Sequence, residues 1–232
     1  MKIEILFEDN YIIVVNKPNK ILIHNSYYAR NIKEATLLDL LKEEFQENYY
    51  PIHRLDRKTS GVLVLAKQKK YVAVFQKLFN SNSIKKKYLG IVRGFIETSC
   101  IIKSPVKHPE TKLYKDAETL CEPILNKQLD IAVHPYQTSR YSLVRLKPAT
   151  GRMHQLRIHM NKISHPIVGD YKYGDRFHNR MFENELNCDN LFLHAHSIHF
   201  EHPISKEKLD LYADLPLNWL KIFKRFDWQF EF

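Results

Sequence analysis

The stretch PIHRLDRKTSG at residues 51–61 leads straight into the apolar run VLVLA at residues 62–66. A short apolar run of this kind predicts a buried strand, and a charged loop held by a rigid strand is a common place for catalytic residues. Asp56 lies between two arginines, whose positive charge favours its ionised form. Asp56 is therefore a candidate catalytic carboxylate. On local chemistry alone, a structural ion pair or a turn cap with Thr59 and Ser60 explains it as well.

Two further clusters combine charge with groups that can contact a base or a carboxylate. In GRMHQLRIH, residues 151–159, Arg157 follows a core-facing leucine of a predicted helix. Its guanidinium is expected at the edge of the buried face, where it could pair with a buried carboxylate, a phosphate or solvent. In KKKY, residues 85–88, Tyr88 puts an aromatic face beside positive charge. That combination suits stacking on an unpaired base, although a strand tyrosine also serves in packing.

Hydrophobic periodicity indicates many strands and a few helices. We expect helices over residues 36–45, 71–79, 152–163 and 217–226, and strands over residues 3–7, 11–15, 61–66, 88–92, 100–106, 141–146 and 191–200. Residues 107–137 are expected to form surface-exposed strand and loop. The order of elements predicts an α+β fold, in which helices pack on a mixed sheet. With 232 residues and no linker rich in Pro, Gly or Ser, one domain or a closely joined pair is the natural expectation, and the prediction is a single domain over residues 1–232.

The composition favours a polyanionic partner. Lys and Arg number 36 against 26 for Asp and Glu, which gives a net charge of +10, and phosphate neutralisation drives nucleic-acid affinity. The lysine-rich drift of an AT-rich genome is an alternative source of that surplus. No apolar run is long enough to span a membrane and the N-terminus lacks a signal-peptide pattern, so a cytoplasmic protein is expected. Three scattered cysteines predict packing residues; they are Cys100, Cys121 and Cys188.

Motifs for cofactors, metals and hydrolytic nucleophiles are missing from the sequence. It contains no glycine-rich phosphate loop and no GxSxG elbow. His154 and His159 are five residues apart, which does not fit the helical zinc pair, and His194 and His196 share a strand face without an evident third ligand. We therefore expect neither a cofactor nor a metal.

Taken together, these stretches resemble the RluA family of pseudouridine synthases. Residues 53–61 look like its catalytic motif HRLDxxTSG, residues 87–94 like its tyrosine strand, and residues 151–159 like its GRxHQ(L/I)RxH helix. HPIVGD at 165–170 and LHA at 193–195 match two more blocks in the expected order. The five blocks extend over most of the chain.

The resemblance implies a mixed, mostly antiparallel sheet with a central cleft and flanking helices. It also implies that Asp56 acts at the flipped uridine, as a nucleophile or as a proton acceptor, that Tyr88 stacks on the uracil, and that Arg157 pairs with Asp56 and keeps it ionised. Arg54 would fill the space that the flipped base leaves. The other expected RNA-binding residues are Arg57, Lys87, Arg152 and His154.

Finer similarity points to the tRNA pseudouridine synthase C subgroup, whose members modify uridine 65 of tRNA. The similarity to this subgroup lies in VNKP at 15–18, in IHNS at 23–26, and in GDYKYGD at 169–175 with Asn179 and Arg180. This implies an RNA partner, most simply tRNA, and a monomer without an S4-like RNA-binding domain. A ribosomal-RNA pseudouridine synthase and a non-catalytic RNA-binding or RNA-folding protein are the alternatives.

Overall fold

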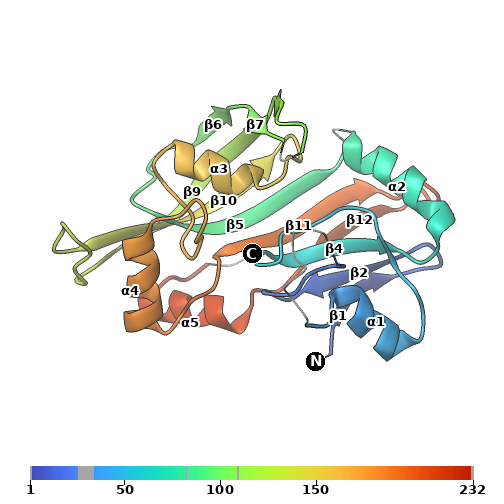
Figure 1. The fold of residues 1–232 in the computed structure, drawn as a ribbon, viewed down its shortest axis with the longest axis horizontal. Helices are drawn as coiled ribbons and strands as arrows, with labels where there is room; N and C mark the ends of the chain where they lie inside the picture. The colour runs from blue at the N-terminus through green and yellow to red at the C-terminus, as the bar shows by residue number, and fades with distance from the viewer. Residues whose placement is uncertain (1, 26–33, 82, 109, 231–232) are drawn as a thin grey trace. The chain divides into compact units, whose positions relative to one another are not determined.

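The computed structural model describes residues 2–25, 34–81, 83–108 and 110–230 (Figure 1). Ser26, which the subgroup resemblance includes, lies outside these ranges. The chain divides into two compact units: Met1–Lys86 with Ala195–Asp214, and Lys87–His194 with Leu215–Phe232. We call them the first and second units. The predicted α+β class and the mostly antiparallel pairing are confirmed, while the single domain over residues 1–232 stays a prediction.

The first unit is built on antiparallel strand pairs. Strand β2 pairs with β1 and β4, β3 also pairs with β4, and β12 pairs with β11. The bounds are β1 Glu4–Glu8, β2 Ile12–Lys17, β3 Tyr50–Pro51, β4 Ser60–Ala66, β11 Leu193–Glu201 and β12 Lys208–Tyr212, with helices α1 Leu37–Phe45 and α2 Lys69–Asn80. The opening hairpin, both helices and the buried β4 follow the sequence prediction, apart from shifts of one or two residues at most ends.

Local chemistry explains where the two helices form. Thr36 caps α1 by accepting a hydrogen bond from the backbone N–H of Asp39, whose carboxylate accepts from the backbone N–H of Thr36 in return. Helix α2 buries Phe75 and Phe79 in the apolar cluster that contains Val64 of β4. This cluster fixes the strand that leaves the charged loop at residues 51–61.

The second unit has an antiparallel sheet in the order β5-β10-β9-β6 and a small hairpin of β7 and β8. Its helices are α3, α4 and α5. The bounds are β5 Lys85–Arg93, β6 Cys100–Lys103, β7 Val106–Lys107, β8 Tyr114–Lys115, β9 Glu118–Leu129, β10 Ser139–Pro148, α3 Gln155–Lys162, α4 Arg176–Leu186 and α5 Leu217–Phe226.

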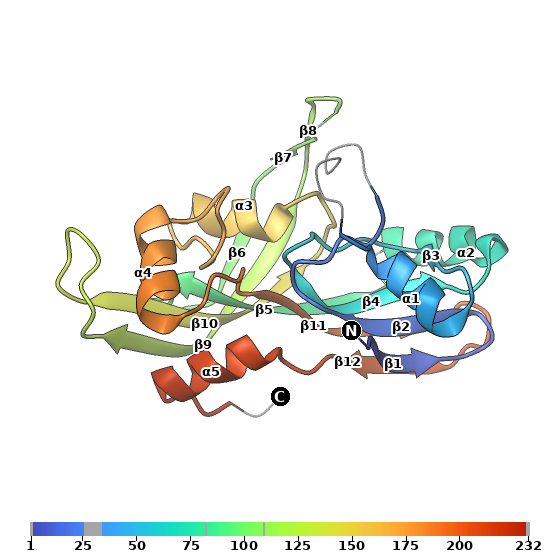
Figure 2. The same ribbon diagram turned by 60° about the horizontal axis from the view of Figure 1, so that its bottom comes forward.

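Helices cover both faces of this sheet, as Figure 2 shows for α3 and α5 on opposite sides of β9 and β10. Alternation along the strands produces the two faces. Ile91 and Leu143 belong to the cluster that contains Trp219 of α5, whereas Val92 and Val144 belong to the cluster that contains Met160 of α3. The sheet therefore provides an apolar surface on which α3, the helix that contains Arg157, packs.

The predicted start of one helix needs correction, and two elements were missed. Helix α3 begins at Gln155 and not at Arg152, because His154 adopts a left-handed conformation with φ of 57° that a helix cannot include. Residues 107–137 form strand and loop, and most of their described side chains are exposed or half-buried, as predicted; within them β9 runs between β10 and β6 and buries Cys121. Helix α4 and strand β12 were not predicted at all.

Among the described residues, no helix is both long enough and apolar enough to cross a membrane.

Candidate active site

Asp56 opens the turn that leads into β4. The backbone N–H of Thr59 donates to the Asp56 carbonyl at 3.0 Å, which closes residues 56–59 into a tight turn. Leu55, Thr59 and Ser60 are buried around the half-exposed Asp56. The turn thus fixes the backbone of a carboxylate that remains partly accessible.

The start of the loop is fastened to β4 by His53. The Val64 backbone N–H donates to His53 Nε2 at 3.0 Å, and the imidazole stacks on Phe79 with ring centroids 4.4 Å apart. Burial, together with the positive charge of Lys86, lowers the pKa of His53 to about 3. A neutral ring is what the bond requires, because Nε2 can accept only while it carries no proton.

His53 should therefore make folding sensitive to acid. Between about pH 6.5 and about pH 3 the unfolded chain binds a proton at this residue that the folded chain does not, so stability falls as the pH decreases through that window. In urea unfolding between pH 7 and pH 4, the free energy of unfolding should decrease less steeply with falling pH for His53→Gln than for the wild type. The difference in slope should be up to about 1.4 kcal/mol per pH unit. Equal slopes for the two proteins would contradict this account.

Lys17 fastens the end of the same loop, and sequence reasoning missed it. Its side chain is fully buried at the end of β2, and Nζ donates to the carbonyls of Pro18, Ile21 and Arg57 at 2.7, 2.9 and 3.1 Å. All three ammonium hydrogens thus have an acceptor. Burial lowers the pKa of Lys17 to about 7, and the negative charge of Asp56 opposes the shift. The loop is held by a buried lysine side chain.

Gly61 lets β4 approach β11 closely. Its φ is +110°, and a Cβ at this position would lie 2.2 Å from the Ala195 carbonyl oxygen. A side chain is therefore excluded, which gives a structural reason for the glycine that ends the motif.

In the second unit, α3 is anchored on β9 through side chains that were not predicted to matter. Buried Gln155 donates to the Glu118 carbonyl at 2.9 Å and to Thr119 Oγ1 at 3.0 Å. His159 Nε2 donates to the Ser104 carbonyl at 2.9 Å, so its Nδ1 accepts from Thr119 Oγ1 at 3.0 Å. These bonds fix the helix on either side of Arg157.

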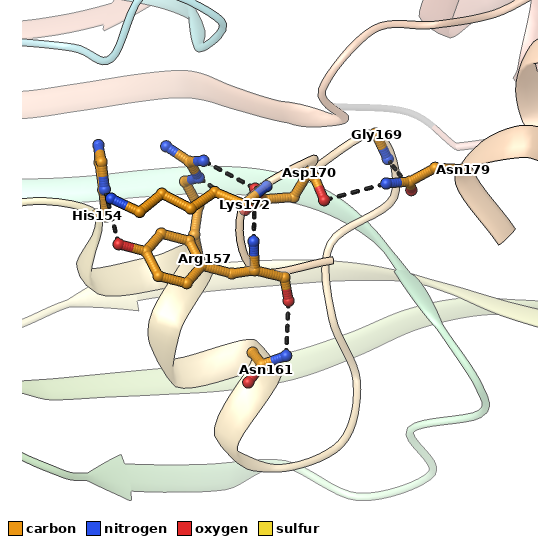
Figure 3. Close-up of polar contacts among 8 residues, drawn as sticks. His154, Arg157, Asn161, Gly169, Asp170, Lys172 and Asn179 are labelled. Carbon is orange, nitrogen blue, oxygen red and sulfur yellow. Dashed lines mark hydrogen bonds and ion pairs between the residues drawn. The ribbon is translucent and has the colours of Figure 1, made fainter. Parts of the chain in front are cut away.

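Arg157 makes a two-point ion pair with Asp170 (Figure 3). Nε donates to Oδ2 at 2.7 Å and Nη2 donates to Oδ1 at 2.8 Å. Asp170 is only 1% exposed, and burial alone would raise its pKa. The bonds and charge of Arg157, with the N–H groups of Tyr173 and Lys172, outweigh this and hold the pKa below its usual range. The buried carboxylate that sequence reasoning expected as one option for Arg157 thus exists, and it is Asp170.

The remaining predicted residues take individual positions within each unit. Tyr88 is half-buried on β5, opposite Leu146 of β10, and packs against the cluster under α3, so its ring has a packing role. His154 Nδ1 lies 3.0 Å from the Tyr173 hydroxyl, and exposed Arg152 donates from Nε to the Asp116 carbonyl.

The predicted set is divided between the two units. Arg54, Asp56 and Arg57 belong to the first unit, and Lys87, Tyr88, Arg152, His154 and Arg157 to the second. The pairing of Arg157 with Asp56 and the central cleft join the units and stay predictions. Within the described ranges, no group of three or more His, Cys, Asp or Glu side chains is arranged to hold a metal ion.

Comparisons with a family model and with sequence relatives point to the same family. The family described as RNA pseudouridylate synthase matches residues 11–162. The tRNA pseudouridine synthase C of Haemophilus ducreyi (strain 35000HP / ATCC 700724) is 37% identical over 241 residues, covering 99% of this chain and 98% of that protein. The enzyme of the same name from Haemophilus influenzae (strain ATCC 51907 / DSM 11121 / KW20 / Rd) is 36% identical over 237 residues, covering 98% and 99%.

Solved structures agree with the sequence relatives. Human RNA Pseudouridylate Synthase Domain Containing 1 has a TM-score of 0.73 and 26% identity, covering 93% of this chain and 84% of that one. Human RNA Pseudouridylate Synthase Domain Containing 4 has a TM-score of 0.72 and 26% identity, covering 97% and 93%.

Proposed function

Because the chain belongs to the RNA pseudouridylate synthase family, we propose that it isomerises one uridine of tRNA, uridine 65, to pseudouridine. The tRNA part of this proposal rests on full-length relatives that are named tRNA pseudouridine synthase C. The same proposal includes a monomer that works in the cytoplasm without a metal or a cofactor.

The observation that carries the proposal is the accessible carboxylate of Asp56, held in a rigid turn inside the family's catalytic motif. The bond between N1 of uracil and C1′ of ribose breaks, the base turns, and C5 bonds to C1′. A proton leaves C5 and a proton is gained at N1, so no atom or electron is gained overall. Asp56 acts on the ribose or the base, as a nucleophile or as a proton acceptor.

Other residues prepare the base for this reaction. The target must leave its stack before the glycosidic bond is accessible. In the proposal, Arg54 fills the vacated place, Tyr88 stacks on the uracil, and Arg157 orients the Asp56 carboxylate. Arg57, Lys87, Arg152 and His154 contact the RNA around it, mostly at phosphates.

Release of tritium from uridine labelled at C5 tests the proposed function directly, because the C5 proton is lost in every turnover. Purified protein is incubated with labelled tRNA transcripts and with a matched set that carries cytidine at position 65. Release that disappears with the substituted transcripts supports the proposal. Release from ribosomal RNA alone would retain the chemistry and overturn the tRNA substrate, and RNA binding without any release would overturn catalysis.

Phosphate contacts should appear in the salt dependence of RNA binding. Arg57→Ala and Arg152→Ala, each tested in an Asp56→Asn background, should weaken tRNA binding and reduce the slope of log Kd against log salt by about 0.7–0.9. Lys224→Ala removes an exposed cation from α5 and serves as the control. Filter binding at several salt concentrations measures all three slopes, and equal slopes would remove the two arginines from the RNA interface.

A further inference from the structure

Asp170 is a buried carboxylate to which neither the family motif nor the proposed mechanism gives a role. Oδ1 accepts the backbone N–H groups of Lys172 and Tyr173 at 2.9 and 3.1 Å, in addition to the bond from Arg157. Its backbone carbonyl accepts from the Gly174 N–H at 2.8 Å. The loop at residues 169–174 therefore wraps around this one side chain (Figure 3).

Asn179 fixes the other side of the same peptide. Its Oδ1 accepts from the Gly169 N–H at 2.8 Å, and its Nδ2 donates to the Asp170 carbonyl at 3.0 Å. Gly169 has a φ of +77°, and a Cβ there would lie 1.8 Å from the Asn190 carbonyl oxygen. A close approach that only glycine permits and a buried amide thus set the backbone from which Asp170 points.

The loop bonds are made independently of the Arg157 side chain. The N–H groups of Lys172, Tyr173 and Gly174 and the amide of Asn179 all bind Asp170 directly. The loop therefore positions the Asp170 carboxylate, and the carboxylate in turn positions the Arg157 guanidinium.

The mode of binding fixes the orientation of the guanidinium. Asp170 occupies the Nε–Nη2 edge, which leaves Nη1 at the opposite end of the plane. The Tyr173 ring lies 5.2 Å from the guanidinium carbon, and the Tyr173 hydroxyl is held at 3.0 Å by His154 Nδ1. With an edge and a face fixed, and only 11% of its side chain exposed, Arg157 has little rotational freedom.

We propose that Asp170 is a positioning residue of the reaction, which sets the direction of the Arg157 guanidinium toward the reacting groups at the expense of its net charge. The inference rests on the proposed function. The change in rate that it predicts for the loss of the Asp170 charge is opposite to the change expected if Arg157 acted through its positive charge alone. Removing the negative charge of Asp170 leaves Arg157 more positive, so a mechanism that needed only charge would keep its rate or gain. A mechanism that needs the Arg157 guanidinium in a fixed direction would lose rate.

The test compares steady-state kinetics of tritium release for Asp170→Asn with the wild type. Asparagine preserves the shape but cannot accept from both Nε and Nη2 while it also accepts the loop N–H groups. We expect kcat to fall about 30-fold and KM for tRNA to stay within about twofold, because the orientation of Arg157 matters in the transition state and not in RNA binding. In an Arg157→Ala background, Asp170→Asn should cause no further loss of kcat.

Two further variants separate positioning from folding. Asp175→Asn removes another ion pair of the same unit, the single-contact and more exposed pair between Arg93 Nη1 and Asp175 Oδ2 at 2.6 Å, and retains a residue that caps α4 well. Its kcat should equal that of the wild type. Arg157→Lys retains the charge without the two-point geometry, and should lose kcat as Asp170→Asn does even if the latter folds poorly.

The outcomes are distinguishable from a failure of the proposed function. An active wild type together with an Asp170→Asn protein as fast as Asp175→Asn, or an Arg157→Lys protein at wild-type kcat, would overturn the inference alone. Full additivity of the Asp170 and Arg157 substitutions would overturn it as well. A wild type that releases no tritium from any RNA would overturn the proposed function and this inference with it.

Discussion

Replacing Asp56 by asparagine is expected to slow pseudouridine formation at least about 1,000-fold, because the carboxylate that acts on the ribose or the base is lost while the side-chain volume is retained. The turn should survive, since its hydrogen bond from the Thr59 N–H ends on the Asp56 backbone carbonyl and not on the carboxylate. Affinity for tRNA should stay within about threefold, because one half-exposed charge contributes little to a large interface with a polyanion.

A matched substitution separates this effect from a general loss of negative charge. Asp210→Asn removes an exposed carboxylate of β12 in the same unit and should leave the rate unchanged. Single-turnover tritium release, with tRNA binding measured in parallel, gives both quantities. A rate for Asp56→Asn above about a tenth of the wild-type rate would rule out an essential carboxylate at this position.

Replacing Lys17 by methionine is expected to lower the free energy of unfolding by about 2–4 kcal/mol, because three carbonyls lose their common donor inside the protein. One of these carbonyls belongs to Arg57, next to Asp56 in the sequence. The loop that carries Asp56 should therefore also lose its fixed geometry, and kcat should fall by about tenfold or more even for the folded fraction.

The control for Lys17 is Lys67→Met at the end of β4. Lys67 also follows an apolar strand, but it is partly exposed and pairs with Glu8 at the surface, so its loss should cost under about 1 kcal/mol. Urea unfolding at pH 6, where Lys17 is mostly charged, measures both. Equal stabilities for the two variants would mean that the buried ammonium does not hold the loop.

The elements that follow a clear hydrophobic period were predicted well from the sequence. Helix α5 has the predicted bounds of Leu217 and Phe226, because Trp219, Ile222 and Phe223 recur at helical spacing along a buried face. Helix α4 was missed because charged and amide residues dominate it. Only tertiary packing shows that Met181 and Phe182 form its core side.

Strand β9 and the start of α3 depended on contacts that a linear pattern does not contain. The sequence ETLCEPILNKQL includes a proline and several charges, so it is typical of an exposed segment, yet it lies between two strands of the sheet. The left-handed conformation of His154 ends the run before α3 although the apolar spacing continues through Met153. A backbone reversal of this kind is set by the tertiary fold.

The chemistry of the site was predictable only in part. Asp56 is proposed from its motif, whereas Lys17 and Asp170 appear in the sequence only as parts of the VNKP and HPIVGD stretches that carry the resemblance. A lysine beside a proline is usually solvated, and nothing in its neighbourhood shows that residues 18, 21 and 57 supply three carbonyls. The signal that could have revealed Asp170 was its place in GDYKYG, where two glycines bracket an acidic residue.

Pseudouridine mapping of tRNA from cells that lack this gene, complemented with the wild type or with Asp56→Ala, tests the central claim most directly. We expect one tRNA signal, at uridine 65, to disappear in the deletion, to return with the wild type and to stay absent with the variant. Return of the signal with Asp56→Ala, or a deletion in which every pseudouridine persists, would contradict the account.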